Sequence, residues 1–352
     1  MGFLSSPPSA VPGPRPPVSR VFGLWRNGWK RVLAAPAIAA GVFAMTILLA
    51  VPLAMVVRGS LASHLKDSLA ADTAATGVNY DWWQEFTAQA TGLGTTFTPS
   101  IIGFASVLDT VGGLLDARAR IAPIAAALAL YLAGWAFLSG GILDRYARQR
   151  PIRVYGFFGA SGAYFFRFLR LAAIAGLMYW CLFAYVHPWF FDELFVDLTR
   201  GMSVERTAFL VRLLFYTIFG AFLLATNLVV DYTKIRIVVE DRYSVLGALA
   251  AALRFVRHHP RQVIGLYALN SLAFLALLAV WALVAPGAGG AGWSMWLGLA
   301  VSQLYIVMRL IMKLQFIASQ IALFQANLAH ASYTSAPLPI WPESPAAEAI
   351  RS

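Results

Sequence analysis

The longest uncharged stretch of the chain runs from Gln262 to Met308, and the segment Pro-Gly-Ala-Gly-Gly-Ala-Gly (286–292) divides it in two. Each half can cross a bilayer, because about 20 apolar helical residues span the hydrocarbon layer. The proline and the glycines break a helix between the two halves. This pattern is typical of a transmembrane hairpin, and it indicates that lipid rather than water surrounds much of the polypeptide.

Four further apolar stretches precede this hairpin. The chain is 59% hydrophobic and only 12% charged, whereas a soluble domain carries about 25% charged residues. The apolar stretches are continuous rather than alternating, which favours helices over a β-barrel. The sequence therefore predicts an all-α integral membrane bundle of six transmembrane helices with short interfacial amphipathic helices. The predicted spans lie at about 32–57, 121–143, 171–191, 210–230, 263–285 and 293–315.

The chain divides into a membrane domain at 20–332 and two tails. Residues 1–19 and 333–352 are rich in proline, and we expect both tails to be disordered, the first of them in the cytoplasm. The outer loop 58–120 is the one sizeable predicted region on its side of the membrane.

Two features of that outer loop carry predictions. Asp81 stands at the start of a helical pattern and is expected to cap it. The apolar stretch 101–115 is short and contains Asp109. We expect it to lie on the bundle as an amphipathic or re-entrant helix, because a seventh span would place a strongly basic loop outside the cell.

Basic residues are concentrated in alternate loops. The formal net charge is +11, and the basic excess lies before residue 32, at 144–170 and at 231–261, whereas 58–120 and 192–212 carry more acidic than basic residues. By the positive-inside rule, both termini are cytoplasmic in a multi-pass protein of a bacterial inner (cytoplasmic) membrane. The basic loops then face anionic lipid headgroups. No nucleic-acid motif is present, and nucleic acid is not an expected partner.

The basic loops share a layout. In each, an aromatic or apolar amphipathic stretch ends in basic residues and leads into a predicted span; these stretches are 21–31, 155–170 and 243–257. Such stretches can lie in the membrane interface, with rings and leucines towards the acyl chains and basic groups among the headgroups. We therefore interpret the chain as three units, each an interfacial helix followed by a transmembrane hairpin.

A polar stripe follows the last predicted span, with members spaced by 7, 4, 7 and 7 residues, which places them on one face of a helix. These are Ser302, Arg309, Lys313, Gln320 and Asn327. Asp231 and Glu240 are the acidic residues expected nearest to Arg309 and Lys313. Two interpretations stay open: a buried anion site for a phosphate- or carboxylate-bearing ligand, or an ion pair that fixes helix packing.

The outer loop carries an aromatic cluster with one acidic side chain, formed by Tyr80, Trp82, Trp83, Glu85 and Phe86. It can bind a sugar or a lipid headgroup, or it can be an aromatic belt at the membrane interface. The single cysteine, Cys181, excludes an intrachain disulfide and a cysteine-cluster metal site. No metal, nucleotide or other cofactor motif is found, so no cofactor is expected.

The segment from Asp231 to Glu240 leads into a small-residue helix (246–253) and then into Arg257-His258-His259-Pro260. Over residues 225–285 this pattern resembles a group of uncharacterised bacterial polytopic membrane proteins, which are similar to the membrane domain of some glycerophosphodiester phosphodiesterases. In those relatives a separate soluble barrel performs catalysis, and the chain has no such barrel. The resemblance implies a membrane-embedded accessory module and assigns no catalytic residue here.

Three functional hypotheses follow. The first is a non-enzymatic module that organises lipids, protein partners or further copies of itself, in line with the missing catalytic constellation. The second is a transporter or lipid-handling protein that uses the polar stripe. The third is a membrane hydrolase or transferase acting on lipid headgroups. It requires an essential residue among Asp81, Glu85, Asp109, His187 and Asp231.

Overall fold

The computed structural model describes residues 17–66, 68–77, 79–97, 111–117, 122–286 and 292–330. Within these ranges the chain forms helices joined by turns and contains no strand. Residues 1–16 of the predicted N-terminal tail, the C-terminal tail 333–352 and Asp109 lie outside the described residues. Most of the predicted outer-loop helix 101–115 does so as well.

Six helical segments are long and apolar enough to cross a membrane, which confirms the predicted all-α class and the number of spans. The protein is a multi-pass membrane protein. The helices that form the spans are α2 (Pro36–Leu65), α6 (Ala122–Arg148), α7 (Val154–Cys181), α9 (Glu205–Val239), α11 (Pro260–Val284) and α12 (Trp293–His330). The shorter helices are α1 (Pro17–Leu33), α3 (Ala70–Thr76), α4 (Tyr80–Gln89), the 3-10 turn η1 (Gly92–Thr96), α8 (Phe195–Thr199) and α10 (Val245–His258).

Two of the three predicted interfacial stretches are separate helices. α1 ends before α2, which begins with a proline at its first turn. α10 is capped at its start by Ser244, whose hydroxyl accepts a hydrogen bond from the backbone N–H of Gly247 at 3.2 Å. It ends at His258, because Pro260 opens the next helix.

The third predicted stretch, 155–170, is not separate, because α7 runs through it without a break. The arginines of this stretch do not interrupt the helix, because a charged side chain can pair with an acid while the backbone hydrogen bonds of the helix continue. Arg167 pairs with Asp241 at 2.7 Å and lies over the ring of Tyr243, 3.9 Å from its centroid. Beyond Cys181 the helix continues through two π-helical segments, η2 (Leu182–Val186) and η3 (Trp189–Leu194), on either side of Pro188, which lacks a backbone donor.

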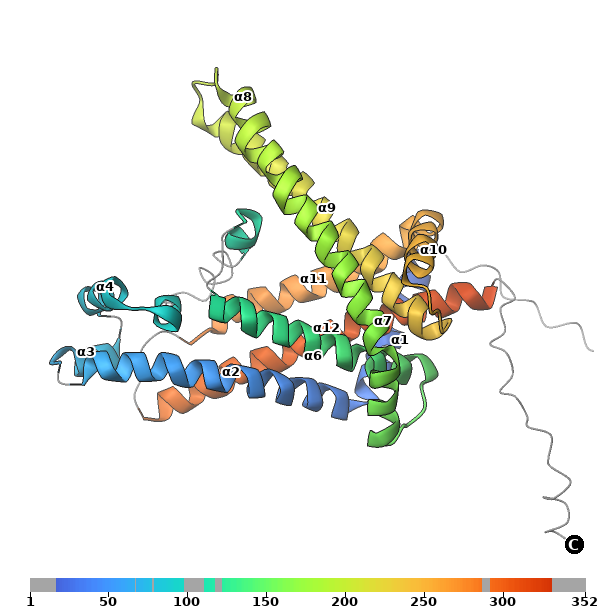
Figure 1. Cartoon of the computed structure of the whole chain (residues 1–352), viewed down its shortest axis with the longest axis horizontal. Coiled ribbons are helices and arrows are strands. Elements are labelled where there is room, and N and C mark those ends of the chain that lie inside the picture. Colours follow the sequence, from blue (N-terminus) through green and yellow to red (C-terminus); the bar gives the residue numbers. More distant parts are fainter. Residues whose placement is uncertain are drawn as a thin grey trace, which may run out of the picture.

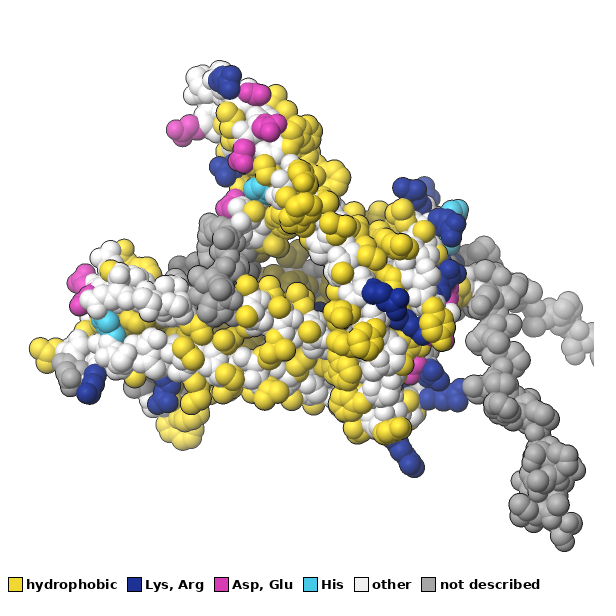
Figure 2. All heavy atoms as spheres, viewed as in Figure 1, with side chains coloured by type: hydrophobic (Ala, Val, Ile, Leu, Met, Phe, Trp, Pro, Cys, Tyr) yellow, Lys and Arg dark blue, Asp and Glu magenta, His cyan; other side chains and the backbone are white. Residues whose placement is uncertain are grey.

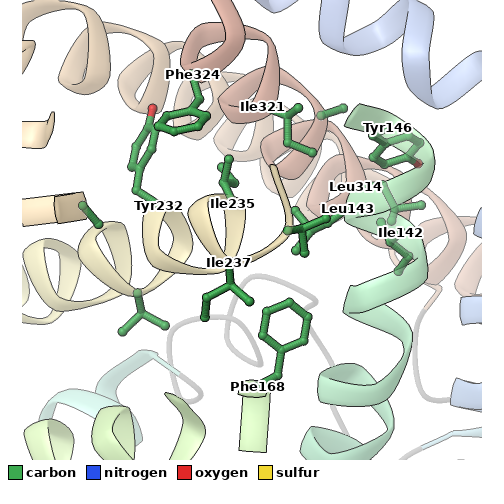
Figure 3. Packing of buried hydrophobic residues seen from close by; sticks show 14 of the residues in the cluster. Ile142, Leu143, Tyr146, Phe168, Tyr232, Ile235, Ile237, Leu314, Ile321 and Phe324 are labelled. Atoms are coloured by element: carbon green, nitrogen blue, oxygen red, sulfur yellow. The ribbon is translucent and has the colours of Figure 1, made fainter. Parts of the chain in front are cut away.

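The buried core lies at one end of the bundle, where α6, α9, α10 and α12 converge. Figure 3 shows side chains of this core from α6, α7, α9 and α12, among them Tyr146, Tyr232 and Phe324, all less than 2% exposed. Figure 2 shows Lys and Arg side chains gathered around α10 at this end, whereas acidic side chains gather near α8. We call the end that carries α10 the basic end.

Towards the opposite end the helices separate. α7 and α9 form an arm that leaves the body made by α2, α6, α11 and α12 (Figure 1). The burial along α9 follows this geometry, since Phe209, Leu213 and Phe222 are exposed, whereas Tyr232 and Ile235 are buried. In a membrane the exposed apolar side chains of the arm face hydrocarbon.

The helix α1 is held inside the basic end by a buried arginine. Arg31 donates from Nη1 to the carbonyl of Tyr146 and to Oε1 of Gln325, both at 2.9 Å, and from Nε to Asn27 at 2.8 Å. Tyr146 belongs to the last turn of α6, whose carbonyls have no partner in their own helix, so a cation there is favourable. Burial lowers the pKa of Arg31 to about 10, which leaves it charged at neutral pH.

Close helix contacts at this end depend on glycine. A Cβ on Gly28 of α1 would lie 2.9 Å from Ser319 of α12, and a Cβ on Gly140 of α6 would lie 2.9 Å from the carbonyl oxygen of Ala160 on α7. Glycine at these positions therefore lets the helix backbones approach each other closely, as is common between membrane helices.

Candidate functional site

The polar stripe of α12 divides into a buried half and an exposed half. Gln320 is 3% exposed, and Asn327 donates to Oε1 of Gln262 at 3.0 Å. Arg309 and Lys313 are exposed. The reason is that α1, α6 and α9 pack around α12 at the basic end. One face of α12 is therefore exposed near Arg309 and buried near Gln320.

Arg309 and Lys313 lie near the middle of a helix of 38 residues. Counted from Trp293, they stand about 24 Å and about 30 Å along the axis. The helix continues for about 26 Å beyond Lys313. A hydrocarbon layer of about 30 Å that begins at Trp293 would end near Lys313, so both cations lie towards one edge of the predicted span.

The ammonium group of Lys313 lies on aromatic rings of α6. Its Nζ is 3.5 Å from the ring centroid of Trp135 and 5.7 Å from that of Tyr131. Such a cation–π contact is worth about 0.5–2 kcal/mol, most where water is excluded. Trp135 itself is buried, so the contact fixes the position of the ammonium group against α6.

Asp231 pairs within its own helix rather than with α12. Its Oδ1 accepts from Lys234 Nζ at 3.0 Å, and its Oδ2 accepts from Asn227 Nδ2 at 3.3 Å. Asn227 also donates to the hydroxyl of Tyr267 on α11 at 3.1 Å. In the part of the chain that the structure describes, no ion pair joins Asp231 to the two exposed cations of α12.

These charged groups still form one electrostatic neighbourhood. Lys313 interacts electrostatically with Asp231, Lys234 and Arg309. Three cations thus stand against one carboxylate, and the surplus is two positive charges. We call these four residues the midhelix cluster. It lies where α9 and α12 pass from the separated part of the bundle into the packed core.

Glu240, the second predicted partner, lies elsewhere. It accepts from Arg236 at 3.0 and 3.2 Å and from Arg242, at the end of α9. It is therefore part of the basic end and not of the midhelix cluster.

The outer aromatic cluster is divided between a small core and the surface. Trp82 and Phe86 are 8% and 2% exposed and pack with His64 and Phe97. The indole of Trp82 donates to Nδ1 of His64 at 3.0 Å. Their burial ties the outer loop to the end of α2.

The other members of that cluster are more exposed, although the indole of half-buried Trp83 donates to the carbonyl of Phe97 at 3.4 Å. Tyr80 is 60% exposed, and its ring lies 5.6 Å from that of Trp83. Glu85 is exposed and accepts from Gln89 at 3.4 Å. The helix α4 that carries them is capped by Asn79, whose side chain accepts from the backbone of Trp82, so the prediction of Asp81 as cap is wrong.

The candidate catalytic residues do not gather. Asp81 and Glu85 are on α4, Asp231 is on α9, and Asp109 is not described. His187 stands between the two π-helical segments, with Nε2 2.8 Å from the carbonyl of Leu115. A search of the described residues finds no group of three His, Cys, Asp or Glu residues that could hold a metal ion.

Sequence reasoning named Asp231 but missed the residues that contact it and Lys313. Asn227 and Lys234 are spaced on the same face of α9 as Asp231, a signal that was readable but weak. Trp135 could not be found, because its contact with Lys313 depends on how α6 crosses α12.

Comparison with known proteins adds no relative. No family model matches the chain, and no curated protein or solved structure matches it either. The resemblance to the membrane domain of glycerophosphodiester phosphodiesterases stays a prediction.

Proposed function

We propose that this multi-pass membrane protein handles lipid by binding an anionic headgroup at Arg309 and Lys313. The observation that carries the proposal is the pair of exposed cations near the middle of α12, which have no carboxylate partner among the described residues. Asp231, the nearest acid in the cluster, is already engaged by Lys234 and Asn227.

The energetics favour an external anion. A cation at the bilayer centre costs about 2.5–3.5 kcal/mol on insertion scales. Arg309 and Lys313 lie towards one edge of the predicted span, where a lipid headgroup is within reach. A phosphate or carboxylate offsets the cost of the cations through charge-assisted hydrogen bonds, and the guanidinium of Arg309 can donate two in parallel. The acyl chains of the same lipid would occupy the apolar surface where the arm of α7 and α9 separates from the body.

The accessory-module hypothesis has one supporting observation, the exposed apolar side chains of the arm, such as Phe209 and Leu213. Those residues would then contact a protein partner or a second copy of the chain. If the module organises proteins rather than lipids, lipid charge has no specific effect on the protein. The two ideas can therefore be separated by changing the bilayer alone.

The orientation belongs to the same proposal. The basic residues around α10 support a basic end in the cytoplasm of a bacterial inner membrane, with both termini on that side. After replacement of the exposed Cys181, we expect an impermeant thiol reagent to label Thr95→Cys in intact cells but not Arg150→Cys. Labelling of Arg150→Cys alone would overturn the orientation.

The lipid site is tested in nanodiscs. The unfolding temperature of the wild-type protein should rise when part of the zwitterionic lipid is replaced by phosphatidylglycerol. We expect the Arg309→Gln/Lys313→Gln variant to lose most of this rise, whereas Arg170→Gln, which removes another exposed cation of a spanning helix, keeps it. An equal response of the double variant and the wild type would reject headgroup binding at α12.

A further inference from the structure

A second group of basic side chains surrounds a cavity of about 280 Å³ where the end of α9 meets α10. Three arginines, two histidines and one phenylalanine line this cavity: Arg236, Arg242, Arg254, His258, His259 and Phe255. The side chain of Arg236 is 13% exposed, whereas Arg242, Arg254 and His258 are exposed. The cavity thus has a half-buried basic wall and an accessible basic rim.

The positive charge of this cavity is only partly compensated. Glu240 accepts from both Arg236 and Arg242. Arg254 has no ion pair within the described residues, and it repels Arg236 electrostatically. In addition, Nε of Arg236 is buried without a hydrogen-bond partner. Three guanidinium groups share one carboxylate, and an anion would relieve both the repulsion and the missing hydrogen bond.

The histidines adapt the end of α10 to an anion. Nδ1 of His258 lies 2.7 Å from the carbonyl of Arg254, and Nδ1 of His259 lies 3.2 Å from that of Phe255. A carbonyl oxygen only accepts, so each Nδ1 carries the hydrogen. These bonds occupy carbonyls that would otherwise direct the negative end of the helix towards a ligand. They leave Nε2 of each ring for a ligand.

We propose that this cavity binds a phosphate group, carried by a lipid headgroup or as free phosphate. Guanidinium groups match phosphate oxygens with paired donors, which favours phosphate as the anion. The volume is near the lower limit of small-molecule pockets, about 300 Å³, so it suits a phosphate or a small phosphorylated headgroup. The exposed side chains of Leu246 and Leu253 on α10 place apolar surface beside the cavity, as expected at headgroup level.

The test uses the full chain in nanodiscs and the variant Arg254→Gln. Arg254 is exposed, so its replacement is compatible with folding. The matched control is Arg257→Gln, which removes an exposed charge from the same helix outside the cavity lining. All proteins also carry Arg309→Gln and Lys313→Gln, so the result does not depend on the site proposed for α12.

Inorganic phosphate is added first, in phosphatidylcholine nanodiscs, with chloride of equal ionic strength as reference. If free phosphate is the ligand, it raises the unfolding temperature of the parent and of Arg257→Gln, and Arg254→Gln weakens phosphate binding about tenfold or more. If the headgroup is the ligand, inorganic phosphate has no effect, and phosphatidic acid in the nanodisc gives the same pattern among the variants.

Two results would overturn the proposal. In the first, Arg254→Gln responds to both probes as the parent does. In the second, Arg254→Gln and Arg257→Gln lose the response equally, which would show a general effect of surface charge rather than a site.

Discussion

The contact between α6 and α7 predicts a stability change of known sign for Gly140→Ala. A Cβ at this position would lie 2.9 Å from the carbonyl oxygen of Ala160 and 3.0 Å from Cα of Ser161. Carbon atoms pack best at about 3.5–4.0 Å. Both neighbours are backbone atoms and cannot rotate away, so the two helices must separate.

The magnitude follows from two opposing effects. Overpacking of a tight contact costs about 1–3 kcal/mol, and replacement of glycine by alanine inside a helix recovers about 0.8–1 kcal/mol. We expect Gly140→Ala to lower the free energy of unfolding by about 1 kcal/mol, within a range of about 0–2 kcal/mol. Gly162→Ala on α7 is the matched control, because a Cβ there meets nothing within 4 Å. It should be as stable as the wild type or more stable.

The assay is reversible unfolding in mixed micelles titrated with SDS, followed by circular dichroism. The order of stability should be Gly162→Ala at or above the wild type and Gly140→Ala below it. If Gly140→Ala is as stable as Gly162→Ala, the close approach of α6 and α7 is wrong.

Three further changes test the packing of the basic end and of Lys313. A Cβ on Gly28 would lie 2.9 Å from a backbone nitrogen of α12, so Gly28→Ala should loosen α1 and speed its cleavage by protease; unchanged cleavage would contradict this packing. Arg31→Ala leaves the carbonyl of Tyr146 without its donor and should cost about 3 kcal/mol of unfolding free energy; a loss below about 1 kcal/mol would argue against the network. Trp135→Leu and Lys313→Gln should show a coupling of about 0.5–2 kcal/mol in a double-mutant cycle. Purely additive effects would exclude the cation–π contact.

The spans could be predicted because hydrophobic length is a local property. The predicted span 263–285 nearly coincides with α11, and the predicted span 293–315 begins where α12 begins. Proline and glycine mark these boundaries in the sequence. The predicted span 171–191 begins after Arg170, which marks a boundary in charge but not in the backbone, since α7 begins at Val154. The helix also continues through Arg167, which pairs with Asp241.

The candidate site shows where sequence reasoning stops. Helical spacing correctly brought Arg309 and Lys313 to one face, but burial of Gln320 on the same stripe depends on which helices surround α12 at each level. The choice of Lys234 as the partner of Asp231 is local and was readable. The contact of Lys313 with Trp135 joins residues far apart in sequence, and only the crossing of α6 and α12 determines it.

An experimental structure in nanodiscs that contain phosphatidylglycerol would examine headgroup binding at α12 itself. We expect density for a lipid phosphate within hydrogen-bond reach, about 3 Å, of both Arg309 and Lys313. Density for acyl chains alone at this position, with Asp231 paired to Arg309 or Lys313, would contradict it and would leave the midhelix cluster as a packing device.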